Sequence, residues 1–294
     1  MNDVELVRLV ESTWLTARSD QRYAALKALR VAVSSDLIDL FDALFDAKLS
    51  NIEDDPNAIV VILVHGIQTD GAWHRLVQDA FSDVPNINVI EAGYDCVTAA
   101  QLVSPFRGTP IEKVAREMRE ARRREPRARM MVIAHSFGSY ILSRILKDAS
   151  DLEFERIILC GSIITRNYKW DLFARNVGPA GILNHVGTGD FYPVLATFAS
   201  VGYGASGRLG FKTGKVVDRF FQLGHSGFFT PRHIRTHWLP FITDGRIERS
   251  DWDVNKPATG LAILILSHPW IGRLIGVLIL CSLVFFGYGL WLLI

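Results

Sequence analysis

Six short apolar runs, separated by helical or polar sequence, constrain this chain more than any other feature. They lie at residues 58–66, 86–94, 129–135, 154–162, 181–190 and 215–225. The first, AIVVILVHG, is apolar at almost every position, which is typical of a strand buried on both faces of a parallel sheet. Helical segments at 111–124 and 138–149 lie between such runs. The alternation predicts right-handed β–α–β crossovers, and therefore an α/β fold with a mostly parallel sheet covered by helices.

The chain divides into four predicted parts. Residues 1–50 have apolar positions at helical spacing, 51–245 hold the α/β domain, 246–273 are a linker and juxtamembrane segment, and 274–294 are apolar. We favour the N-terminal helices as a cap on the domain that follows, and a partner-binding or sensing module is the open alternative. The Gly-rich segment 199–215 is predicted as a long loop, either a lid or a flexible connection.

The C-terminal segment has the length and composition of a membrane anchor. Residues 274–294 carry no charge over 21 positions, and a helix of that length spans about 31 Å, close to the hydrocarbon core of a bilayer. A soluble-domain helix has no need to be apolar on every side. Arg273 flanks the segment and no signal peptide is evident, so we predict a single-pass anchor, with bilayer lipid as a partner and the α/β domain facing the cytosol. Gly272 and Gly276 indicate a possible homo-oligomer through the anchor helix.

Charge and cysteine content exclude several classes of protein. The formal net charge is +1, which argues against a nucleic-acid-binding protein. Cys96, Cys160 and Cys281 are scattered, so we predict neither a disulfide framework nor a thiolate metal site, and favour a reducing compartment. The Arg-rich stretch 116–129 is predicted first as a solvated helix and turn, and second as a contact for anionic lipid headgroups. No aromatic platform accompanies it, so no nucleic-acid partner is predicted.

One serine lies at a predicted strand-to-helix turn. In RMMVIAHSFGSYIL, residues 129–142, an apolar run ends at His135-Ser136 and helical sequence follows. A sharp turn of this kind projects a hydroxyl into an open site, and it requires small residues on both sides of the serine. Ala134 and Gly138 meet that requirement. The pattern is a G-x-S-x-G elbow with alanine in the first glycine position.

This arrangement resembles the α/β-hydrolase family of serine hydrolases, which includes lipases and esterases, over about residues 55–243. In that family an earlier strand ends in a His-Gly loop that supplies half of the oxyanion hole, and HGIQ at 65–68 matches it. The resemblance implies Ser136 as nucleophile and the backbone N–H groups of Ile67 and Phe137 as the oxyanion hole. It implies support of the loop and elbow by His65, Gly66 and Gly138.

The family's order along the chain is serine, acid, histidine. Asp190, at the end of ILNHVGTGD, is predicted as the acid and Asp171 is its competitor. His225, in a loop after the last apolar run, is predicted as the base. His233 and His237 are predicted on a partly exposed helix face, because no H-E-x-x-H pattern or third ligand supports a metal site. No role is assigned to His74, His135, His185 or His268, and no metal or cofactor is predicted.

The predicted reaction is acyl transfer to water by a membrane-anchored serine hydrolase. Since a hydrolase at a bilayer meets acyl lipids, a lipase or phospholipase is the first expectation, with an acyl lipid or ester as substrate. A thioesterase or protein deacylase with the same triad is the second. A non-catalytic or triggered membrane effector or adaptor that uses the hydrolase fold is the alternative from another class.

Overall fold

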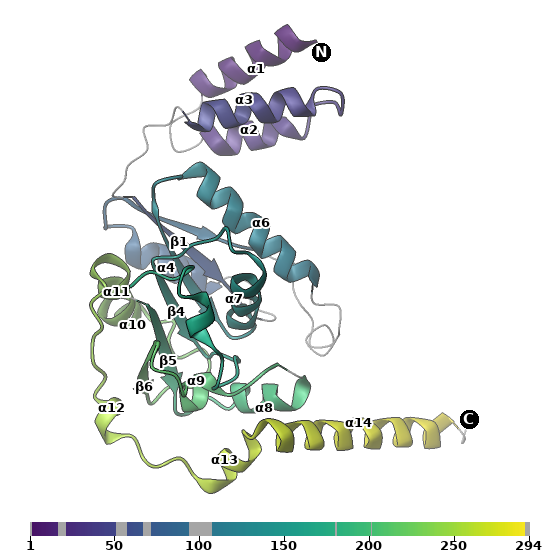
Figure 1. Cartoon of the computed structure of the whole chain (residues 1–294), viewed down its shortest axis with the longest axis vertical. Coiled ribbons are helices and arrows are strands. Elements are labelled where there is room, and N and C mark those ends of the chain that lie inside the picture. Colours follow the sequence, from purple (N-terminus) through teal and green to yellow (C-terminus); the bar gives the residue numbers. More distant parts are fainter. Residues whose placement is uncertain are drawn as a thin grey trace. The chain divides into compact units, whose positions relative to one another are not determined.

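The computed structural model describes residues 2–16, 22–50, 58–66, 72–93, 108–179, 181–200 and 202–291. These residues contain a six-stranded sheet in which every pairing is parallel (Figure 1). The strands are β1 Ile59–Val64, β2 Ile87–Glu91, β3 Arg129–His135, β4 Arg156–Cys160, β5 Ile182–Gly187 and β6 Val216–Phe221. Each of the six apolar runs contains one strand, and the prediction of a mostly parallel sheet is confirmed.

The strand order is β2–β1–β3–β4–β5–β6. The chain adds β2 on one side of β1 and then β3 on the other, so the order of the sheet reverses between β1 and β3. In open parallel sheets, ligands bind outside the carboxyl ends of strands at such a switch point. Val64 at the end of β1 pairs with Ala134 near the end of β3. This pairing brings the His-Gly loop and the serine turn to the same edge of the sheet.

Helices cover both faces of the sheet. On one face, Val61 and Leu63 of β1 join an apolar cluster with Trp73 of α4 (Ala72–Phe81) and Trp238 of η3 (Ile234–Trp238). Alternate strand residues point to the opposite face, where α7 (Phe137–Asp148) packs on β1 and β3. Burial on both faces explains why the strands are continuously apolar. The remaining helices of the α/β part are α6 Gly108–Arg124, η2 Trp170–Phe173, α8 Tyr192–Ala199, α9 Ser206–Leu209, α10 Pro231–His233, α11 Leu239–Asp244 and α12 Trp252–Asn255.

Three helices occupy the N-terminal segment: α1 Asp3–Thr16, α2 Arg22–Arg30 and α3 Ile38–Ser50. They have an apolar cluster of their own, formed by Leu6, Val10, Trp14, Leu26, Leu37 and Phe41. The chain separates into two compact units, Met1–Pro56 with Glu120–Ala128, and the remainder. The C-terminal end of α6 thus groups with the N-terminal helices, as in the 2.8 Å ion pair between Lys27 and Glu120.

Several arginines of the 116–129 stretch have partners within the protein. Arg119 donates from Nε to Asp151 Oδ2 at 2.6 Å, and Arg129 lies 3.4 Å from Glu155. Arg122 donates to the carbonyl of Ala128 at 2.8 Å. These bonds agree with the interpretation of the stretch as a surface helix and turn, while contact with lipid headgroups stays a prediction.

The C-terminal helices pack on the α/β part of the chain. Helix α14 (Pro269–Trp291), which follows α13 (Leu261–Leu266), lies against α8 (Figure 1). A Cβ added at Gly272 would lie 2.5 Å from Thr197 Oγ1, and one at Gly276 would collide with the carbonyl oxygen of Phe198. The small-residue face predicted to pair two anchor helices is therefore occupied by α8 of the same chain.

The predicted membrane span at 274–294 is not supported. Over the ranges that the structure describes, we find no helix with both the length and the apolarity to cross a bilayer. Residues 292–294 of the predicted span lie outside those ranges.

The Gly-rich segment, predicted as a long loop, is closely packed on the α/β domain over part of its described residues. It forms the short helix α9, in which Ser206 and Gly207 are buried. A Cβ at Gly207 would collide with the backbone of Ser162, and Asn184 Nδ2 donates to the carbonyl of Ser206 at 3.1 Å. Gly207 thus permits close packing of this segment on the chain that follows β4, beside Asn184 of β5.

We expect the stability of the protein to depend on the protonation of Asp218 in β6. Its carboxylate accepts hydrogen bonds from Asn184 and the N–H of Phe211, but burial outweighs these and raises the pKa of Asp218 to about 6. The folded state therefore retains a proton that the unfolded chain releases near pH 4, and stability falls as the pH rises from about 4 to about 6. Above pH 6 the loss is complete, at about 3 kcal/mol.

Urea unfolding at pH 4 to 7.5 tests this expectation. The free energy of unfolding of Asp218→Asn should rise relative to the native protein by about 3 kcal/mol across that range. Parallel stability profiles for the two proteins would contradict it.

Candidate active site

Ser136 has a strained backbone. It lies between the last residue of β3 and the first residue of α7, with φ 53° and ψ −121°. A positive φ at a non-glycine residue is rare and is retained only where the surrounding structure enforces it. Here the N–H of Ser136 donates to the carbonyl of Cys160 at 3.1 Å, and its carbonyl accepts from Ser139 Oγ at 2.6 Å. These bonds hold the predicted elbow in its sharp turn.

The small residues around Ser136 permit α7 to approach the end of β1. A Cβ added at Gly138 would lie 2.5 Å from the carbonyl oxygen of His65 and would collide with that of Val64. A Cβ at Gly66 would lie 2.9 Å from Ser136 Cβ and 3.3 Å from Oγ. Glycine is therefore required at both positions. Ala134 lies in the sheet, where its methyl group is accommodated and buried.

Asp190 and His225 form a hydrogen-bonded pair. His225 Nδ1 lies 2.8 Å from Asp190 Oδ2, and the Asp190 side chain is completely buried. Asp190 follows β5 and His225 follows β6, and the N–H of Gly189 joins the two loops by donating to the carbonyl of Leu223 at 3.0 Å. Asp171, the competing acid, is exposed in η2. Because an ionised carboxylate only accepts, the pair fixes the Nδ1–H tautomer of His225 and leaves Nε2 free to take a proton.

Two residues beside His225 were not singled out from the sequence. The ring of Tyr192 stacks on the imidazole, with centroids 4.6 Å apart and planes at 25°. Gly161, at φ 55°, follows β4, and a Cβ there would lie 2.9 Å from His225 Cε1. The sequence does indicate Gly161, because a glycine directly after an apolar run suggests a close approach at the end of a strand. Nothing in the sequence indicates the contact of Tyr192, because it depends on how the loops after β5 and β6 meet in the folded protein.

The predicted oxyanion loop is described only in part. Ile67 and Gln68 lie outside the described residues, whereas His65 and Gly66 are buried next to the elbow. The ring of His65 donates from Nδ1 to the carbonyl of Gly66 at 2.7 Å, which suits a residue that orders the loop rather than a base. Phe137 is the first residue of α7, so its N–H lies at the positive end of the helix dipole, which favours negative charge.

The prediction of a partly exposed face for His233 and His237 is wrong for His233. His233 is buried, with Nε2 2.9 Å from His185 Nδ1, which also accepts from Trp238 Nε1 at 3.0 Å. Burial lowers the pKa of His233 to about 3, so these rings are neutral core residues. In the part of the chain that the structure describes, no group of three His, Cys, Asp or Glu side chains is arranged to hold a metal ion.

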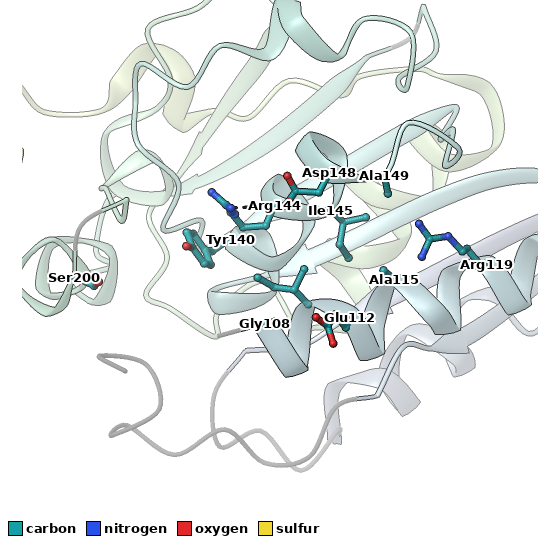
Figure 2. A pocket seen from close by; sticks show the side chains of 11 residues that line it. Gly108, Glu112, Ala115, Arg119, Tyr140, Arg144, Ile145, Asp148, Ala149 and Ser200 are labelled. Carbon is teal, nitrogen blue, oxygen red and sulfur yellow. Dashed lines mark ion pairs between the residues drawn. The ribbon is translucent and has the colours of Figure 1, made fainter. Parts of the chain in front are cut away.

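A pocket of about 650 Å³ lies beside α6 and α7 (Figure 2). Tyr140, one helical turn after Ser136, lines it together with the 3.7 Å ion pair of Arg144 and Asp148. Ser136, Asp190 and His225 do not line this pocket. We therefore assign it no part in the chemistry of the elbow.

Comparison with known proteins gives distant structural matches. No family model and no curated protein matches the chain. A solved α/β serine hydrolase without a lid, from Xanthomonas campestris, is 15% identical, with 71% of this chain and 87% of that chain covered and a TM-score of 0.41. An α/β serine hydrolase homologue from Coxiella burnetii is 12% identical over 65% of this chain and 86% of that one, with a TM-score of 0.41. An arylesterase is 13% identical over 66% and 76%, with a TM-score of 0.40. The structural neighbours are thus serine hydrolases and esterases, and the functional argument rests on the geometry of the site.

The close approach at Gly138 predicts that one added methyl group destabilises the fold. We expect Gly138→Ala to lower the free energy of unfolding by about 1–3 kcal/mol, because the added Cβ displaces α7 from the β1 carbonyls. Gly214→Ala is the matched control, since no atom lies within 4 Å of its added Cβ, and it should change stability by less than about 0.5 kcal/mol. Urea unfolding measures both variants. Equal stability of the two variants would contradict the close approach.

Proposed function

We propose that this protein is a serine hydrolase that cleaves acyl esters, with Ser136 as nucleophile, His225 as base and Asp190 as the acid that orients the base. The observation that carries the proposal is the combination of a strained serine elbow with a fully buried Asp190 carboxylate that bonds Nδ1 of the partly exposed His225. All three residues follow the carboxyl ends of strands in one parallel sheet. A backbone conformation of this kind is expected where it serves a site.

The proposed reaction has two stages. Ser136 Oγ attacks the carbonyl carbon of the ester while its proton passes to His225 Nε2, and the N–H groups of Phe137 and Ile67 stabilise the oxyanion. The C–O bond to the alcohol then breaks, and the imidazolium returns the proton to the departing oxygen. In the second stage water gives a proton to Nε2 and attacks the acyl-enzyme. The carboxylic acid leaves, and Ser136 recovers its proton from the imidazolium.

Acyl lipids are the proposed substrates. Phe191, Tyr192 and Leu195, at the start of α8, expose 42%, 63% and 44% of their surface, and Tyr192 stacks on the base. An exposed apolar surface beside a reacting centre suits an apolar acyl chain more than a polar substrate. This preference does not require membrane anchoring. A bilayer location, with bilayer lipid as a partner, stays a prediction from the sequence.

Labelling by a fluorophosphonate probe tests the nucleophile. We expect the native protein to be labelled and Ser136→Ala not to be labelled. Asp190→Asn should be labelled much more slowly, because loss of the correct His225 tautomer costs about 10⁴-fold in comparable triads. Ser226→Ala, which removes an exposed hydroxyl next to His225, is the control and should be labelled like the native protein. A folded native protein that resists the probe, or labelling that survives in Ser136→Ala, would refute the proposal.

The substrate class is tested with purified protein on two ester substrates. Acyl lipid in liposomes should be hydrolysed with a higher kcat/KM than a short soluble ester, since the apolar face of α8 contacts only the longer chain. Tyr192→Ala should reduce that preference, while Leu172→Ala, which removes an apolar side chain 73% exposed in η2, should not. Hydrolysis of the short ester without any lipid cleavage would exclude the lipid assignment and leave the esterase.

A further inference from the structure

His135, the residue before the elbow serine, has a contact that the reaction above does not use. Its ring is buried at the end of β3, and its Nε2 lies 3.0 Å from the main-chain carbonyl oxygen of His225. The ring centroids of His135 and His225 are 4.5 Å apart, and Phe229 packs edge-on against His135 at 4.8 Å. A side chain of β3 therefore holds the loop that contains the base.

The contact fixes the protonation of His135. A carbonyl oxygen only accepts hydrogen bonds, so Nε2 must carry the proton and Nδ1 the lone pair. Burial and the neighbouring His225 hold the pKa of His135 well below the usual value, so the ring is neutral. Nδ1 is buried and has no hydrogen-bond partner among the residues that the structure describes. Loss of the Nε2 bond would leave the His225 carbonyl without this donor, and a buried polar group without a partner is destabilising.

The two edges of the His135 ring face the two halves of the site. A Cβ placed on Gly66 would lie 3.3 Å from Ser136 Oγ and 3.4 Å from His135 Nδ1. A Cβ placed on Gly161 would lie 2.9 Å from His225 Nδ1 and 3.2 Å from His135 Nε2. The Nδ1 edge of His135 thus lies near Ser136 and the His65-Gly66 loop, and its Nε2 edge lies near His225.

Among the residues that the structure describes, the backbone hydrogen bonds of the His225 loop, residues 222–230, lie within the loop or at its two ends. The bonds of Gly227 to Gly224 and of Phe229 to Ser226 lie within the loop, and the bond between Gly189 and Leu223 holds its beginning. At His225 itself, the side chain is held by Asp190 and the main chain by His135. Both contacts are needed to fix the ring, because a side-chain bond alone leaves the backbone free to shift.

We propose that His135 is a positioning residue for the base, and that its Nε2–H, through the His225 carbonyl, holds the imidazole in register with Ser136. This inference rests on the proposed function. It predicts a loss in kcat rather than in substrate binding, because a displaced base slows proton transfer and leaves the acyl site unchanged. Displacements near 1 Å cost about 10²-fold in rate.

Two variants distinguish the effect of the His135 hydrogen bond from the effect of its packing. His135→Leu fills most of the volume without a donor, whereas the amide of His135→Gln can present an N–H near the position of Nε2. We expect His135→Leu to lower kcat about 10²-fold with KM changed less than about threefold, and His135→Gln to recover most of the rate. Thermal unfolding of all three proteins verifies that the variants are folded. Equal rates for the leucine and glutamine variants, or native kcat in the leucine variant, would overturn the proposal.

Nitrogen NMR of the native protein tests His135 independently of catalysis and of variants that fail to fold. His135 should remain neutral with the proton on Nε2 between pH 5 and 9, and its resonance is assigned by its absence from the His135→Gln spectrum. A ring that titrates in this range, or carries its proton on Nδ1, would overturn the proposal even if fluorophosphonate labels Ser136. Absence of labelling with the expected tautomer would instead refute the proposed function.

Discussion

The parallel pairing of β1 with β3 is the contact on which the rest of the structure depends. It places two strand ends side by side, and α7 can begin there only because Gly138 lets its backbone meet the β1 carbonyls. The same approach forces Ser136 into a positive φ, since the chain must turn from strand to helix within one residue. Burial of both sheet faces stabilises the protein enough to hold this strained conformation, because relaxing the turn would separate α7 from the core.

The remaining site residues follow from the order of the sheet. Strands β4, β5 and β6 succeed β3 in sequence and in space, so each later loop returns to the same edge. Asp190 and His225 come from adjacent loops, which explains how residues 35 positions apart form a 2.8 Å contact. The strained turn at Ser136 thus lies at the switch point and the Asp190–His225 pair on the later strands, and His135 contacts the His225 carbonyl.

The sequence was informative where local physics decides the structure. Continuous apolar runs predict the strands, and small residues around Ser136 predict the turn, because both depend on neighbours within a few positions. Burial of His233, packing of the 199–215 segment and the contact between α14 and α8 depend on distant parts of the chain. A glycine pair on an apolar helix predicts close packing, but it does not specify the partner, and here the partner is Thr197 and Phe198.

Asp190 has a second structural duty. While Oδ2 faces His225, Oδ1 accepts the N–H of Tyr192 at 3.0 Å, so one carboxylate both orients the imidazole and fixes the first turn of α8. A change at Asp190 would therefore reach beyond the His225 contact. It would also disturb the start of α8, the helix against which α14 packs.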